Sequence, residues 1–393
     1  MQANSNFPIE IIHIDLDHSV ATDFKVTTEN IFFVFWMNKI PVGQAFASAC
    51  ADGSLNIEEI ARTSVLSEAL ETARKPFSYG SPMKVTVVIC TRDRPDELER
   101  CLASFSTQTR HPDQILVVDN ASKDGRTMMA ANRAGVDYVR EDRPGLDFAR
   151  NTGAIAAKGD LVVYTDDDVV ITPNWLERLI MAFDDDDVMA VTGLVLPAEL
   201  ETEAQYIFEK DWSFGRGYMR IDFGEAFFNR HRKQGCPAWE VGAGANMAFR
   251  KQIFDEIGLF DERLDVGAAG CSGDSEYWYR ILAAGWRCRY EPSAVVFHYH
   301  RRTFEGLANQ LQAYMRGHVT ALFVQFERTR EYGNLRRAFV SLPVYYVHRC
   351  IRRLLHGSDF SNQFLFQEIK GYLAGFLYYA ASKKIVLPSL RAR

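Results

Sequence analysis

The feature that most restricts the fold is a regular alternation of apolar and helical segments after Lys84. Strands are predicted where β-branched residues run together, and helical patterns lie between them. In chain order the segments are Val85–Cys90, Pro95–Gln108, Ile115–Asp119, Gly125–Ala134, Val136–Val139, Ala149–Ala157 and Leu161–Thr165. Alternation at this spacing predicts an α/β fold with a mostly parallel sheet and helices on both faces. In such sheets ligands bind beyond the carboxyl ends of the strands, so the residues after each strand are the candidate functional residues.

Two further regions flank this α/β segment. The N-terminal one has two strand-like runs and one helix-like run, at Ile9–Leu16, Ile31–Trp36 and Ile57–Ala73. These runs predict a small α+β unit, and Pro76, Gly80 and Pro82 form the expected linker after it. The region after about residue 305 has a helical pattern and no further predicted strand. We therefore expect three parts, at residues 1–80, 81–305 and 306–393.

The composition is that of an ordinary globular protein, with 47% hydrophobic and 24% charged residues among 393. A net charge of −6 argues against general binding to nucleic acid. The longest apolar runs fall short of the ~20 residues that a membrane-spanning helix needs. The N-terminus lacks the pattern of a secretory signal, and the 7 cysteines form no C-x-x-C pair. These features predict a cytoplasmic protein with reduced thiols.

The chain is basic and aromatic between residues 328 and 357. Seven arginines stand there against one acidic residue, Glu331, with aromatic and aliphatic residues between them. The pattern fits a helix lying on the cytoplasmic face of a membrane, and it fits equally a helix packed on the rest of the protein. Periodicity does not separate the two, so peripheral membrane contact through residues 328–357 is one of two open interpretations.

Acidic residues follow two of the predicted strands. Asp119 ends one strand, and Asp166, Asp167 and Asp168 follow Leu161–Thr165. Because side chains alternate along an extended chain, Asp166 and Asp168 are expected on one side and Asp167 on the other. Two carboxylates at a strand end can hold Mg²⁺ together with phosphate oxygens, although acidic residues are also common in solvated turns. The pattern predicts a site for a divalent cation and a diphosphate.

The order of the short motifs resembles that of the family 2 glycosyltransferases, which have the GT-A fold. The resemblance runs from about Val85 to about His300. The motifs that carry it are Val85–Pro95, Cys101–Phe105, Val117–Ser122, Pro144–Ala154, Gly159–Asp168 with the family's D-x-D motif, Gly242–Lys251 and Ile257–Leu264. The resemblance implies that residues 81–305 are a GT-A glycosyltransferase domain.

The resemblance also implies roles at the matching positions. Asp119 would bind the nucleobase of a nucleotide-sugar donor, and Asp166 would face the ribose. The full set of implied donor-binding residues is Thr91, Arg92, Asp119, Arg150, Asp166, Asp167 and Asn246. Asp168 would bind a divalent cation, Mg or Mn. His298 and His300 alternate near the end of a strand, and His300 is the second predicted metal ligand, although a lone histidine is more often a packing residue.

Asp274 lies in a segment that resembles the family's catalytic-base motif, except that Gly273 replaces the usual Glu. It would remove the proton of the acceptor hydroxyl. The structural alternative is a helix cap, because Asp274 or Ser275 precedes a predicted helix. Implied contacts to the sugar or acceptor are Trp239, Glu240 and Glu276.

Together these features predict an inverting, metal-dependent glycosyltransferase that moves a sugar from a nucleotide-diphosphate donor to a hydroxyl of a glycan or lipid-linked acceptor. A nucleotidyltransferase is the first alternative, but it would carry a glycine-rich loop after the first strand, and Cys90–Pro95 has no glycine. A nucleotide-sugar-binding assembly subunit without turnover is the second, and the trio Asp119, Asp168 and Asp274 argues against it. The sugar, the nucleobase and the acceptor stay open.

Overall fold

The computed structural model describes residues 7–18, 24–25, 28–49, 54–74, 83–357 and 363–382. Its centre is a sheet with the strand order β10-β14-β11-β13-β9-β6-β7-β8, to which β12 adds by pairing with β14. The strands are β6 (Val85–Thr91), β7 (Gln114–Asn120), β8 (Asp137–Glu141), β9 (Leu161–Asp166), β10 (Val169–Ile171), β11 (Val188–Pro197), β12 (Ile221–Phe223), β13 (Asn246–Arg250) and β14 (Arg287–His298). The four strands β8, β7, β6 and β9 are parallel, as predicted, and β13 is antiparallel to β9 and β11.

Helices cover both faces of this sheet. They are α3 (Pro95–Ser104), α4 (Arg126–Ala134), α5 (Leu146–Ala156), α6 (Trp175–Met181), α7 (Glu203–Trp212), α8 (Glu225–His231), α9 (Ile253–Ile257) and α10 (Gly273–Ala283), with short 3-10 turns at Phe105–Thr107, Arg232–Gln234 and Ala238–Val241. Alternation along β6 divides the core: Val88 packs in the cluster that contains α5 and α10, and Val87 packs in the cluster that contains α3 and α6. The expected layered α/β architecture is therefore confirmed.

The N-terminal unit is a separate three-stranded sheet, β1 (Glu10–Asp15), β3 (Asn30–Met37) and β4 (Ile40–Ser48), with a two-stranded pair, β2 (Phe24–Lys25) and β5 (Ser54–Leu55). The helix predicted over residues 57–73 is two helices, α1 (Ile57–Ser64) and α2 (Ser67–Arg74). The break occurs because Val65 forms a β-bridge with Gly43. The contact is so close that a Cβ on Gly43 would lie 2.5 Å from the carbonyl oxygen of Ser64. The expected linker residues from Pro76 to Pro82 lie outside the described residues.

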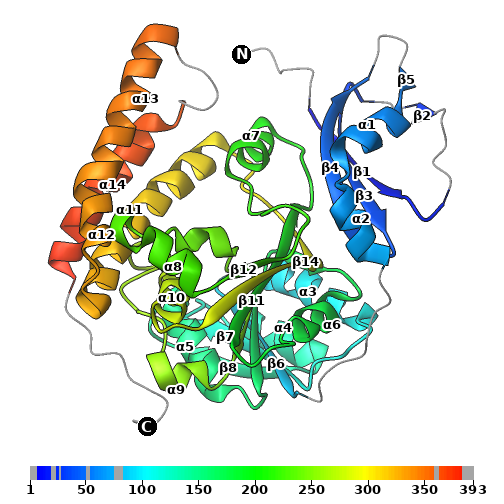
Figure 1. Ribbon diagram of the computed structural model, residues 1–393. Coiled ribbons are helices and arrows are strands. Elements are labelled where there is room, and N and C mark those ends of the chain that lie inside the picture. The colour runs from blue at the N-terminus through cyan, green and yellow to red at the C-terminus, as the bar shows by residue number, and fades with distance from the viewer. Residues whose placement is uncertain are drawn as a thin grey trace.

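The region after residue 303 is helical throughout its described part: α11 (Phe304–Thr329), α12 (Tyr332–Arg336), a π-helical turn (Arg337–Ser341), α13 (Leu342–His356) and α14 (Leu365–Ala381). α14 packs along α11, where Gly371 and Gly375 allow the two backbones to approach. In Figure 1 these helices and the N-terminal unit lie on opposite sides of the large sheet. Among the described helices, none combines the length and the apolar character needed to cross a membrane. The division into domains at residues 80 and 305 stays a prediction.

Candidate active site

A cavity of about 1410 Å³ lies beyond the carboxyl ends of β6 and β9. Its walls include these strand ends, the end of α7, the loop 242–245, the start of α10, α11, and the turn that leads into α13. The strand ends contribute Thr91 and Asp166, and the helices contribute Asp274 and Arg337. The site thus has the position expected for a parallel sheet, but it also reaches the C-terminal helices, which the sequence did not predict.

One end of the cavity is acidic. Ligand atoms of Asp166, Asp168 and His298 lie within 4.8 Å of one another, so the three could hold a metal ion. Asp166 ends β9, and His298 ends β14 opposite Val169, the residue that follows Asp168. Asp167 is not a member of this group. Its carboxylate accepts hydrogen bonds from Thr91 Oγ1 at 2.6 Å and from Arg94 at 2.9 Å.

The three adjacent carboxylates perturb one another. Burial and the charge of Asp168 raise the pKa of Asp166 to about 6 and that of Asp167 to about 7. Burial alone would raise the pKa of Asp168 too, but His298 and Arg94 bring it below its ordinary value. A cation at this point would relieve the repulsion between Asp166 and Asp168. Carboxylate oxygens are suitable ligands for Mn²⁺ and Mg²⁺, and an imidazole nitrogen beside them favours the transition-metal ion Mn²⁺.

The histidine of this cluster is His298 and not His300, which corrects the sequence-based choice. His298 Nε2 lies 3.3 Å from Asp168 Oδ1, whereas His300 Nε2 faces Glu209 Oε2 at 3.2 Å. The two rings meet at their Nδ1 atoms, 3.1 Å apart. Burial and His298 hold the pKa of His300 well below its usual value, so its neutral ring can accept at one nitrogen and donate at the other. A hydrogen-bonded chain therefore runs from Glu209 through both histidines to Asp168.

Two more predicted contacts are placed differently by the structure. Asn246 is fully buried in β13, where its amide bonds the carbonyl oxygens of Leu194 and Ala294 and accepts from the Trp175 indole. Glu276 is also fully buried and is paired with Arg280 at 2.9 Å. On a helix, residues two apart point in nearly opposite directions, so Asp274 can face the cavity only if Glu276 turns inward. Both side chains are structural and do not line the cavity.

The predicted nucleotide residues lie around the ends of β6 and β7. Thr91 and Arg92 line the cavity. Asp119 is fully buried beside it and accepts hydrogen bonds from the Ser122 amide at 2.9 Å and from Tyr138 at 2.8 Å. Its contact with Arg140 at 3.2 Å leads toward the surface, since the Arg140 side chain is 41% exposed. The role of Asp119 at the nucleobase stays a prediction.

Asp274 lies in the middle of the cavity, in the first turn of α10. Its Oδ1 accepts from the backbone and the hydroxyl of Ser275 at 2.6 and 3.0 Å. The cap position of α10 is Ser272, so Asp274 is not the N-cap that the alternative interpretation proposed. A Cβ on Gly244 would lie 2.9 Å from its Oδ2, so glycine keeps this oxygen accessible. Burial and the charge of Asp265 raise the pKa of Asp274.

Arg150, predicted at the nucleotide, connects this region to the interior. It is almost fully buried and binds Asp147 at 2.9 Å and Asp265 at 2.6 Å. Sequence reasoning missed Asp265, although it directly follows the Ile257–Leu264 motif. It also missed Arg94, which bonds both Asp167 and Asp168. The position of Arg94 within the Val85–Pro95 motif could have indicated it. No local sequence signal marked Glu209.

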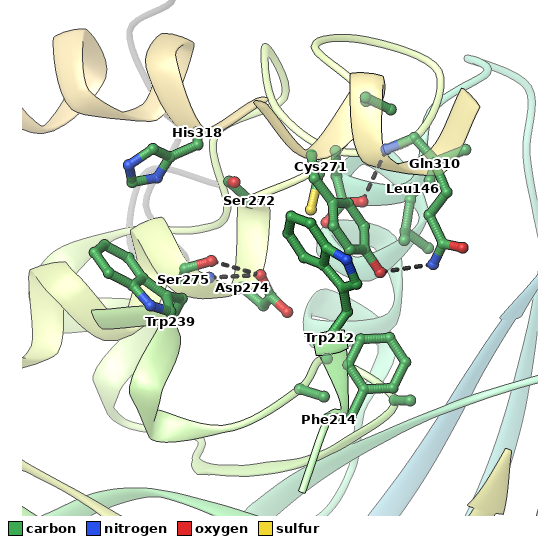
Figure 2. A pocket seen from close by; sticks show the side chains of 18 of the residues that line it. Leu146, Trp212, Phe214, Trp239, Cys271, Ser272, Asp274, Ser275, Gln310 and His318 are labelled. Atoms are coloured by element: carbon green, nitrogen blue, oxygen red, sulfur yellow. Dashed lines mark hydrogen bonds between the residues drawn. The ribbon is translucent and has the colours of Figure 1, made fainter. Parts of the chain in front are cut away.

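The other end of the cavity is aromatic and basic. The guanidinium of Arg337 lies 4.3 Å from the centre of the Trp239 ring, and its Nε donates to His318 Nε2 at 2.9 Å. Trp239 and Glu240 line the cavity, in agreement with their predicted position. In Figure 2, Asp274 lies between Trp239 and His318 on one side and Trp212 and Phe214 on the other. Phe214 contacts His298 edge-on at 5.5 Å, so its side of Asp274 is the acidic side.

Comparison with known proteins identifies the fold and the domain. The model of glycosyl transferase family 2 matches residues 86–258. The chain is 25% identical over 186 residues to a glucosyl-dolichyl phosphate glucuronosyltransferase of Haloferax volcanii, covering 46% of this chain and 56% of that protein. It is 28% identical over 261 residues to a pre-mycofactocin glycosyltransferase of Mycobacterium tuberculosis, covering 64% and 50%. The match therefore spans about half the length of these relatives.

A solved structure, the mannosyltransferase of Pyrobaculum calidifontis in complex with GDP-Man and Mn²⁺, superposes with a TM-score of 0.50. The two sequences are 19% identical, and the superposition covers 81% of this chain and 94% of that one. At this identity the likeness concerns the fold. Residues 86–258 therefore match glycosyl transferase family 2, and the chain has the GT-A fold.

Proposed function

We propose that the protein is an inverting, metal-dependent glycosyltransferase that uses a nucleoside-diphosphate sugar. The observation that carries this proposal is the arrangement of two separate acidic groups along one cavity. Asp166, Asp168 and His298 form a cluster with the chemistry of a cation site, while Asp274 stands apart from them with a raised pKa. A transfer to a hydroxyl needs both, because the leaving diphosphate and the attacking hydroxyl carry charge at different places.

The side chains of this cluster are suitable ligands for a divalent cation. Asp168 and His298 would hold a divalent cation, with Asp166 beside them, and a bound cation supplies charge neutralisation for the departing diphosphate. Arg94 holds Asp167 and Asp168 in place through hydrogen bonds of 2.9 and 3.0 Å. The P. calidifontis enzyme was solved with Mn²⁺, which makes Mn²⁺ the first cation to test.

Asp274 serves as the base. Its accessible Oδ2 accepts the proton of the acceptor hydroxyl while that oxygen attacks the anomeric carbon of the sugar. The bond between this carbon and the phosphate oxygen breaks in the same displacement, so the configuration inverts. Burial suits Asp274 to this role, because a raised pKa makes a carboxylate a stronger base than an exposed aspartate.

The donor would lie at the ends of β6, β7 and β9. Thr91 and Arg92 line the nucleotide side, and Asp119 would take the base through its buried carboxylate. Arg150 positions this region through its bonds to Asp147 and Asp265. The acceptor would approach Asp274 from the side of Trp239, whose ring offers a flat surface for a sugar.

A peripheral membrane contact is part of the proposal. Several large apolar side chains are exposed on α13, including Val347, Ile351, Leu354 and Leu355, and Leu354 is 85% exposed. A helix with such a stripe and nearby arginines binds anionic lipid surfaces. One relative is named as acting on a lipid-linked sugar, glucosyl-dolichyl phosphate. The acceptor proposed for this chain is therefore lipid-linked.

Vesicle flotation tests the membrane contact. Vesicles of phosphatidylglycerol and phosphatidylcholine should carry the wild-type protein at low salt, and the Leu354→Glu, Leu355→Glu variant should stay in the soluble fraction. Leu66→Glu, a change at an exposed apolar residue of the N-terminal unit, is the matched control and should float. Wild type and double variant remaining together in one fraction would assign the apolar stripe to a protein interface.

The enzymatic proposal is tested by incubating the protein with a panel of nucleotide sugars and measuring release of the nucleoside diphosphate with Mn²⁺ and with EDTA. The proposal is supported if at least one nucleotide sugar releases its nucleoside diphosphate with Mn²⁺ and not with EDTA. Binding of a nucleotide sugar without any release, with or without acceptor lipids, would favour a sensor or assembly subunit instead.

A further inference from the structure

Arg337 is a cavity residue to which the proposed transfer reaction gives no role. It lies between α12 and α13, at the start of the π-helical turn, and its side chain lines the cavity. Turns of this kind inside helices are rare and occur often at functional sites. The stem of Arg337 packs against Gly235, where a Cβ would lie 2.8 Å from it. The position of the guanidinium is therefore built into the fold.

The guanidinium of Arg337 forms no ion pair with a carboxylate in the described part of the chain. Among the described residues, Arg337 contacts the His318 ring, which accepts a hydrogen bond from its Nε, and the face of Trp239. Burial and the neighbouring arginine keep the pKa of His318 well below its usual value, so this ring is a neutral acceptor. The two terminal nitrogens of Arg337 make no hydrogen bond to any described residue, although the side chain lines the cavity. These two nitrogens can therefore donate hydrogen bonds side by side to a ligand.

The other cations of this end differ from Arg337 in this respect. Arg216 donates to the carbonyl oxygens of Ser213, Gly215 and Trp239, and Arg316 donates to the carbonyl of Ala269. Glu240 acts on Arg337 only through its charge, since it is exposed to water and makes no ion pair with Arg337 among the described residues. Glu368, which also lines the cavity, is paired with Arg349. A partly buried guanidinium with a free fork is the preferred binding group for phosphate.

We propose that Arg337 binds a phosphate group of the acceptor, and that this group is attached to an apolar chain. The inference rests on the proposed function, since the diphosphate of the donor belongs at the acidic end with the cation. A second phosphate then needs its own cationic site on the far side of Asp274, which Arg337 supplies. Tyr345 lines the cavity and is 48% exposed on α13, the helix that carries the apolar stripe. A lipid phosphate can therefore reach Arg337 from the surface where its chain would lie.

Calorimetric titration tests this site without donor or metal. The probes are farnesyl phosphate, farnesol and inorganic phosphate. Wild-type protein should bind farnesyl phosphate at least about tenfold more tightly than farnesol, because a charge-assisted fork contributes that much. Arg337→Gln should remove this difference. Arg336→Gln is the matched control, since Arg336 is the exposed neighbour outside the cavity, and it should bind both probes as the wild type does.

Inorganic phosphate separates the two sources of the group. If inorganic phosphate binds more weakly than farnesyl phosphate, the site is one for a lipid phosphate. If both bind equally well and both depend on Arg337, the site is one for free phosphate and the proposed apolar chain is wrong. A preference for farnesyl phosphate that persists in Arg337→Gln would overturn the site itself. Arg337→Lys keeps the charge and the packing, so it guards against misfolding. It should bind farnesyl phosphate a few-fold more weakly than wild type because it lacks the fork. Failure of the donor assay leaves these results unchanged, so the two proposals fail separately.

Discussion

The two ends of the cavity are built in different ways. The acidic end consists of residues at strand ends: Asp166 ends β9, Asp168 directly precedes β10, and His298 ends β14. The short turn from β9 to β10 and the pairing of β10 with β14 fix their positions. The basic end consists of Trp239, His318 and Arg337, which come from a 3-10 turn, α11 and the π-helical turn and meet only where these elements pack together. We infer that the first end performs a task common to the family and that the second end determines which acceptor is used.

The largest effect is expected from breaking the acidic end. Asp168→Asn keeps the shape but removes the charge that would hold the cation. The transition state then loses several kcal/mol of stabilisation by the cation, which corresponds to a decrease in metal-dependent turnover on the order of 10⁴-fold. Release of nucleoside diphosphate and binding of Mn²⁺ should be measured together. Asp186→Asn, at an exposed carboxylate, is the control and should be unaffected. Normal Mn²⁺ binding by Asp168→Asn would place the cation elsewhere.

Asp274→Asn separates the two ends functionally. The variant should bind donor and Mn²⁺ normally and lose transfer by about 10³-fold, because the base acts on the acceptor and not on the diphosphate. Donor affinity is measured by calorimetry and transfer by product formation. Weakened donor binding with unchanged turnover of the bound complex would move Asp274 into the donor pocket.

Paired histidine variants sharpen the assignment within the acidic end. His298→Phe should weaken Mn²⁺ binding by at least about 100-fold, and His300→Phe by about tenfold, because the first removes a ligand and the second only the group that orients it. Phenylalanine keeps the ring packing in both. Calorimetric titration of Mn²⁺ gives the comparison, and the opposite order would restore His300 as the ligand.

The smallest expected effect is a displaced acidic limb in the pH profile. The raised pKa of Asp274 means that it takes up a proton at a higher pH than the ordinary value of 3.8. Since the base must be unprotonated, transfer at saturating Mn²⁺ should fall as the pH is lowered through that raised pKa. Rates from pH 4 to pH 8 give the profile. A rate that stays constant down to the range of an ordinary aspartate would contradict the role of Asp274.

The same contrast explains what the sequence could predict. The parallel strands and the pair Asp166 and Asp168 follow from short-range alternation, so both were predicted correctly. Alternation could not choose between His298 and His300, because both lie on the same side and only the pairing of β14 with β10 distinguishes them. Asn246 and Glu276 were assigned from their neighbours in a motif, and adjacent residues point in different directions.

The basic end could not be predicted, because its contacts join residues far apart in the sequence. Arg337 meets His318 and Trp239 only after α11, α12 and the Ala238–Val241 turn have packed together. Strand β4 was missed for a local reason: Ile40–Ser48 contains Pro41, Gly43 and several small residues, so it lacks an apolar run. The helical C-terminal region itself was predicted correctly.

The most direct test of the two-ended cavity is a crystal structure with Mn²⁺ and the nucleoside diphosphate found in the donor screen, recorded at a wavelength where manganese scatters anomalously. We predict a manganese peak at Asp168 and His298, with the diphosphate beside it and no nucleotide bound to the guanidinium of Arg337. A manganese peak away from Asp168 and His298, or a diphosphate bound to Arg337, would contradict it.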